Sequence, residues 1–162
     1  MKYTLKQFKD DVIQWSTERD IIKFGTVDGQ LDKVTEEADE TIEAICAGCD
    51  TSTMDGIGDT AVTLINIDAV QKSNTDFTLI EFDADKLGEQ KPRDALALMC
   101  LVKFEATYTE EDYLMAWEFL QEAAYHLNVD FMDCCELAWN EIKDRKGYFC
   151  DKTKTFVKEE SV

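Results

Sequence analysis

Apolar residues recur along most of the chain at the spacing of amphipathic helices. Phe8, Val12 and Trp15 follow this spacing and predict a first helix over about residues 4–19. Residues 20–29 contain two glycines and a turn signal, and are predicted to form a loop. The same periodicity predicts further helices over about residues 30–47, 53–71, 93–106, 109–127 and 131–145. The pattern favours an all-α fold, and the short connection between the helices over residues 30–47 and 53–71 favours an antiparallel arrangement of these two helices in a bundle.

The third predicted helix and the segment after it differ from the rest of the chain. The helix over residues 53–71 is apolar around much of its circumference, as expected for a helix in the middle of a bundle. Residues 72–92 then break the helical pattern, and residues 77–82 are predicted to form a short strand or an extended arm. The sequence leaves open whether this segment forms a subunit contact or a lid.

Two neighbouring predicted helices bring acidic residues into one region. Glu36 and Glu40 stack on one face of their helix with Glu37 on its flank, and Asp55 and Asp59 share a face of the next helix. If the two helices are antiparallel, Glu37 and Glu40 can face Asp55 and Asp59. Such close like charges repel one another unless a cation lies between them. Oxygen ligands without His or Cys indicate Mg²⁺ or Mn²⁺.

A structural explanation of the same residues remains open. Carboxylates on a helix usually form a solvated face, and this chain is rich in them. Ser52 and Asp55 also fit a capping box, in which Asp55 only fixes the start of a helix.

The order and context of these residues resemble the MazG-like nucleoside triphosphate pyrophosphohydrolases, which belong to the all-α NTP pyrophosphatase superfamily. Members carry EExxE on one helix and ExxD on the next, and this chain has Glu36-Glu37-x-x-Glu40 followed by Asp55-Gly-Ile-Gly-Asp59. Further stretches are similar to family members: residues 4–19, 29–31, 138–147 and 155–159. Of these, residues 29–31 and 155–159 are similar to phage-type members.

The resemblance has one departure. The first acidic residue of ExxD would fall at position 56, which is glycine here. Asp55 is the natural substitute, because it precedes Asp59 by four residues and shares its helical face.

The resemblance also implies a domain organisation. Residues 1–150 are interpreted as a single MazG-like domain of the all-α NTP pyrophosphatase type, with an insertion over residues 72–108. Residues 151–162 are interpreted as a charged C-terminal tail. Family members are dimers or tetramers, so the resemblance implies a homo-oligomer.

The implied reaction is hydrolysis of a nucleoside or deoxynucleoside triphosphate to the monophosphate and pyrophosphate. A triphosphate carries about four negative charges, so an acidic pocket binds it only through divalent cations. Mg²⁺, with Mn²⁺ as the alternative, would be held by Glu37, Glu40, Asp55 and Asp59 and would lower the pKa of a bound water. Glu36 or Glu40 is the candidate general base for this water.

Substrate-binding residues are expected on three helices. Lys33 could reach a phosphate, or could pair with a neighbouring glutamate instead. Trp15 could stack on the base, although a tryptophan at helical spacing is more often part of the core. The phosphate-contacting end that the resemblance implies consists of Asn140, Lys143, Arg145 and Lys146. Basic residues at that position also complement the helix dipole.

Composition adds a rival interpretation. The 162 residues include 35 acidic and 17 basic side chains, for a formal net charge of −18. Such a surface repels nucleic acid and anionic membranes, so neither is an expected partner. A non-catalytic acidic binding protein, such as a DNA mimic or an inhibitor on the same fold, would carry the same charge. No apolar run is long enough for a membrane span, which predicts a cytoplasmic location, in the host cytoplasm if the chain is phage-encoded.

The six cysteines are predicted to be reduced, small buried residues. Cys46 and Cys49 form a CxxC, but no second CxxC or nearby His completes a zinc site.

Overall fold

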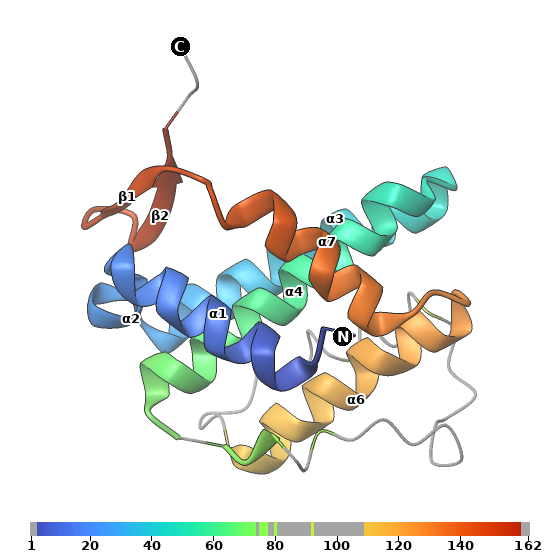
Figure 1. Cartoon of the computed structure of the whole chain (residues 1–162), viewed down its shortest axis with the longest axis horizontal. Coiled ribbons are helices and arrows are strands. Elements are labelled where there is room, and N and C mark those ends of the chain that lie inside the picture. The colour runs from blue at the N-terminus through green and yellow to red at the C-terminus, as the bar shows by residue number, and fades with distance from the viewer. Residues whose placement is uncertain (1–2, 74, 78–79, 81–91, 93–108, 160–162) are drawn as a thin grey trace.

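The computed structural model describes residues 3–73, 75–77, 80, 92 and 109–159. Its helices are α1 (Leu5–Glu18), α2 (Ile21–Phe24), α3 (Val27–Ala47), α4 (Asp50–Gln71), α6 (Glu110–His126) and α7 (Phe131–Ile142) (Figure 1). Strands β1 (Gly147–Cys150) and β2 (Thr155–Lys158) follow the last helix. The described part of the chain is therefore mostly helical, which confirms the predicted all-α class.

Helix α4 lies at the centre of the bundle. It packs against α1, α2, α3, α6 and α7, and every residue from Thr60 to Asp68 is buried. A helix that is covered on all sides needs apolar or small side chains around its whole circumference. The predicted central position of this helix is confirmed, and α3 runs antiparallel to it in a helical hairpin.

Capping residues fix where several helices begin and end. Thr4 forms a capping box with Gln7 at the start of α1, and Thr109 forms one with Asp112 at the start of α6. Helix α3 ends at Gly48, whose positive φ of 67° is the left-handed conformation that glycine adopts without steric cost.

Two helices begin earlier than the periodicity predicts. Thr26 caps α3, so α3 starts at Val27. The loop predicted over residues 20–29 is therefore shorter than expected, and it also contains the short helix α2. Helix α4 starts at Asp50 with Cys49 as its N-cap. Asp55 therefore lies inside the helix, and the alternative in which it caps a helix start is wrong.

Two glycines allow α4 to approach its neighbours closely. A Cβ at Gly56 would lie 2.1 Å from Thr41 Oγ1 on α3, and a Cβ at Gly58 would lie 2.3 Å from the Cys134 carbonyl oxygen on α7. Any larger residue must displace one of these groups. At Gly56, where the resembled family has glutamate, the packing of α3 on α4 therefore leaves no room for a larger side chain unless Thr41 moves.

A β-hairpin lies where the sequence predicted the start of a charged tail. β1 and β2 pair antiparallel, with Gly147 opposite Lys158. Phe156 of the hairpin packs against Trp15, with ring centroids 5.4 Å apart, and Phe149 packs against Phe24 at 6.0 Å. These aromatic contacts hold the hairpin against α1 and α2, as Figure 1 shows.

The segment between α4 and α6 is described only in part. Phe77 packs edge-on against Trp117 of α6, with ring centroids 5.7 Å apart. Most of the predicted arm over residues 77–82 and all of the predicted helix over residues 93–106 lie outside the described residues. No described helix is long and apolar enough to cross a membrane.

The cysteines do not share one environment. Cys134 and Cys135 are buried as predicted, whereas Cys46 and Cys49 are exposed and Cys150 is partly exposed. The prediction of burial is therefore wrong for these last three. Cys46 and Cys49 lie at the turn between α3 and α4, which extends beyond the bundle (Figure 1), and Cys150 is the last residue of β1 in the hairpin. Cys100 lies outside the described residues.

Candidate acidic site between α3, α4 and α7

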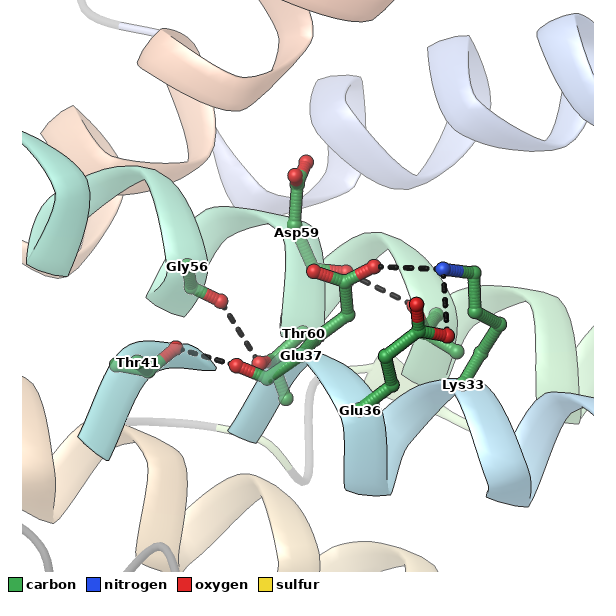
Figure 2. Close-up of polar contacts among 8 residues, drawn as sticks. Lys33, Glu36, Glu37, Thr41, Gly56, Asp59 and Thr60 are labelled. Carbon is green, nitrogen blue, oxygen red and sulfur yellow. Dashed lines mark hydrogen bonds and ion pairs between the residues drawn. The ribbon is translucent and has the colours of Figure 1, made fainter. Parts of the chain in front are cut away.

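On α3, one lysine forms ion pairs with two carboxylates. Lys33 Nζ lies 2.8 Å from Glu36 Oε2 and 3.3 Å from Glu37 Oε1, as Figure 2 shows. Burial would lower the pKa of Lys33, but its contacts with the two glutamates outweigh burial and raise it. Burial raises the pKa of Glu37, and Lys33 opposes that rise. Lys33 therefore forms the ion pair with neighbouring glutamates that the sequence predicted as one of its two roles.

On α4, a carboxylate is left without such a partner. The pKa of Asp59 rises to about 7, first because the group is buried and then because Glu37 and Asp55 carry like charges. Arg145 opposes this rise but does not cancel it. Figure 2 shows the Asp59 carboxylate pointing away from Lys33. Asp59 is therefore half-protonated near neutral pH, which is unusual for an aspartate.

Asp55 faces α7 rather than α3. Burial raises its pKa, and the neighbouring Glu141 raises it further. Its Oδ1 is buried and accepts no hydrogen bond from the described residues. Arg145 forms an ion pair with Glu141, so the arginine only partly compensates the two aspartates. An excess of negative charge thus lies between α4 and α7.

Arg19 fixes the position of Arg145. Its Nε and Nη2 donate to the Arg145 carbonyl oxygen at 3.1 and 2.9 Å. The Arg19 guanidinium also lies over the Trp15 ring, 4.6 Å from the centroid. This contact joins residues 126 positions apart in the chain, so no local pattern could have predicted it.

Trp15 occupies the core and also lines a pocket. It is 6% exposed and packs between Arg19 and Phe156. Its indole Nε1 is buried and has no hydrogen-bond acceptor among the described residues. A buried N–H without a partner is costly, so an acceptor on a ligand would be favourable there.

A pocket of about 240 Å³ joins these residues. Five predicted site residues line it: Trp15, Lys33, Glu37, Asp59 and Arg145. They come from α1, α3, α4 and the chain just after α7. Helices that are distant in sequence therefore place an indole, two acids and two bases around one space.

Other predicted residues lie outside this lining. Glu40 is exposed one turn beyond Glu36 and pairs with none of the described residues. Asn140 and Lys143 are exposed and bond to each other at 2.7 Å, and Lys146 is exposed as well. Of the predicted basic end of α7, only Arg145 reaches the pocket.

The pocket also contains residues that were not predicted as site residues. Asn66 accepts a hydrogen bond from Ser16 at 2.6 Å in the buried wall. A sequence signal existed for Asn66, which follows Asp59 at helical spacing. Phe156 and Lys158 also line the pocket, but they reach it only because the C-terminal hairpin folds back onto α1.

Glu37, Asp55 and Asp59 offer the carboxylate oxygens that a hard cation prefers, but their positions do not form a metal site. Among the residues that the structure describes, no three acidic, His or Cys side chains lie close enough to hold a metal ion. The unpartnered Asp55 Oδ1 and the raised pKa of Asp59 are both features that a divalent cation would relieve. Glu37 would have to turn from Lys33 toward Asp59 to complete such a site.

Comparison with models of protein families, with curated proteins and with solved structures found no match for this chain. Its function must therefore be inferred from its residues and their geometry.

Proposed function

We propose that the chain is a Mg²⁺-dependent pyrophosphohydrolase that cleaves nucleoside or deoxynucleoside triphosphates to the monophosphate and pyrophosphate. One observation carries the proposal: Glu37 and Asp59, from antiparallel helices, line one pocket together with Lys33 and Arg145. The pocket thus combines oxygen ligands for a cation with basic groups for phosphate. The resemblance to MazG-like enzymes supports the same reaction.

Glu37, Asp55 and Asp59 are the residues that would hold Mg²⁺, with Glu40 as a further ligand or base. The cation would supply charge neutralisation of the phosphates and a bound water of lowered pKa. The raised pKa of Asp59, about 7, falls when a cation binds, because the charged form is then stabilised. Metal binding therefore releases protons from this site near neutral pH.

Of the two candidate bases, Glu40 is the better one in this arrangement. Glu36 already accepts a hydrogen bond from Lys33 at 2.8 Å, so this oxygen would have to give up that contact before it could accept a proton from a water. Glu40 has no such partner among the described residues and follows Glu36 by one helical turn. A general base must lie within hydrogen-bond reach of the water that it activates.

Trp15 and Arg145 would hold the two ends of the substrate. Arg145 offers planar donors that suit a phosphate, and Arg19 keeps its backbone in place. Trp15 lines the pocket, and its buried indole N–H has no acceptor among the described residues. Arg19 already lies over the Trp15 ring, which leaves less of the ring for stacking on a base.

The experiment is a measurement of pyrophosphate release from a panel of NTPs and dNTPs with Mg²⁺ or Mn²⁺. Glu40→Gln should abolish release, whereas Glu43→Gln, an exposed glutamate on the same helix, should leave it unchanged. Release that is metal-dependent and lost only in the first variant would establish the enzyme. Absence of release from every nucleotide with either metal would contradict the proposal and favour the acidic binding protein.

A further inference from the structure

Three basic residues line the pocket, and they differ in what they already bind. Lys33 contacts Glu36 and Glu37, and Arg145 contacts Glu141. Lys158 is the third, and no carboxylate of the described residues pairs with it. In a chain of net charge −18, a pocket lysine without an acidic partner is notable. It can bind an anion without first giving up an ion pair.

The hairpin holds Lys158 at a defined place. Lys158 lies opposite Gly147 in the strand pair, and the Glu159 N–H donates to the Lys146 carbonyl oxygen at 3.0 Å. Two residues before Lys158, Phe156 packs against Trp15. Alternate residues of a strand point to the same side, so Lys158 and Phe156 both line the pocket. The position of this lysine is therefore set by backbone pairing rather than by a loose chain end.

Close packing leaves the hairpin little freedom at this point. A Cβ at Gly147 would lie 2.3 Å from the Val157 carbonyl oxygen and 2.4 Å from Phe156 Cζ. The Phe156 ring thus fills the space above Gly147, next to the pocket wall. This packing fixes the backbone of the strand, from which the exposed Lys158 side chain extends.

We propose that Lys158 binds a phosphate group of the ligand, and that the β1–β2 hairpin is a wall of the substrate site. Naming the ligand as a nucleoside triphosphate rests on the proposed function. That Lys158 contacts an anionic group rests on its place in the pocket lining, together with Arg145, and on its lack of an acidic partner among the described residues. Lysine binds phosphate as a mobile point charge, and it complements the planar donors of Arg145 on the neighbouring segment.

The first test uses inorganic tripolyphosphate with Mg²⁺, which carries the three phosphates without base or sugar. Binding is measured by titration calorimetry on the full chain. Lys158→Gln should weaken binding by about tenfold, the loss expected for one charge-assisted hydrogen bond. Lys158→Arg keeps the charge and should bind nearly as tightly as the unmodified chain. Lys152→Gln is the matched control, because Lys152 is exposed on the same hairpin and does not line the pocket.

The second test separates this inference from the proposed function. If the chain releases pyrophosphate, Lys158→Gln should raise KM for the triphosphate by about tenfold with little change in kcat. Tripolyphosphate binding that depends on Lys158 in a chain without hydrolysis would support the lysine site and contradict the enzyme. Equal binding by Lys158→Gln and Lys152→Gln would overturn the inference, even if hydrolysis were established.

Discussion

Helices α3 and α4 each bring two carboxylates toward the same region, yet the two pairs are in different electrostatic states. On α3, Glu36 and Glu37 share Lys33. On α4, Asp55 and Asp59 have no basic residue on their own helix and share Arg145 with Glu141. The acids on α4 are therefore the less compensated pair.

The difference shows which helix depends more on a bound cation. On α3, the charges of Glu36 and Glu37 are partly compensated within the helix itself, because Lys33 is three and four residues from these partners. The acids of α4 can be satisfied only from outside, by protons, by Arg145 or by a metal ion. The largest effects of mutation, pH and Mg²⁺ should accordingly be found on α4.

The largest expected effect is on activity. Asp59→Asn keeps the shape of the side chain but removes a charged metal ligand, and should lower kcat for pyrophosphate release by about 1,000-fold. Glu36→Gln removes an exposed charge already paired with Lys33, and should change kcat by less than about tenfold. Equal losses in the two variants would contradict the distinction between the helices.

The next effect concerns the spacing of the two helices. Gly56→Ala places a methyl group 2.1 Å from Thr41 Oγ1 and should destabilise the fold by about 2 kcal/mol. Adding Thr41→Ala removes the obstructing hydroxyl and should recover at least about half of that loss. Urea unfolding of the single and double variants measures both values. No recovery in the double variant would mean that another contact fixes the spacing.

Stability should depend on pH through Asp59. Its pKa is about 7 in the folded chain and has the ordinary value of 3.8 when unfolded, so the folded chain binds more protons between these values. The free energy of unfolding should therefore fall as pH rises across that range. Without metal, Asp59→Asn should raise the free energy of unfolding by about 2 kcal/mol near pH 8 and by little near pH 4.

Glu36→Gln is the matched control for that measurement. It breaks an exposed ion pair and should lower the free energy of unfolding by about 0.5 kcal/mol near pH 8. If Glu36→Gln stabilised the fold, or Asp59→Asn destabilised it, the acids on α4 would not be the less compensated pair.

The smallest expected effect is the response to Mg²⁺. Saturating Mg²⁺ near pH 8 should stabilise the unmodified chain by about 1–2 kcal/mol, because the ion binds only the folded site. The midpoint of thermal unfolding should rise accordingly, and the rise should be lost in Asp59→Asn but kept in Glu36→Gln. A shift of equal size in all three proteins would indicate general binding to the acidic surface.

Much of the helical framework was predictable from local patterns. The capping box at Thr4 and the breaking glycine at Gly48 act within one turn, so their effect is visible in the sequence. The buried circumference of α4 follows from its apolar composition. The early starts of α3 and α4 were missed because their caps, Thr26 and Cys49, precede the periodic apolar residues.

The candidate site was predictable only in part. Helical spacing placed Glu37 and Asp59 on facing sides of two antiparallel helices, and both line the pocket. It could not show that Asp55 would face Glu141, because that contact depends on how α7 crosses α4 at Gly58. The resemblance pointed to Arg145 without indicating that Arg19 holds its backbone.

The sequence by itself determined the helices, the acidic stripes and the local ion pair of Lys33, because each depends on residues within about one helical turn. Only the tertiary structure decided which acids are left without compensation and which basic residue is left unpaired. Asp59 and Lys158 are separated by nearly a hundred residues and meet at one pocket. Their place in one pocket depends on packing across the bundle, where the contacts of glycines and aromatic rings set distances that no local pattern records.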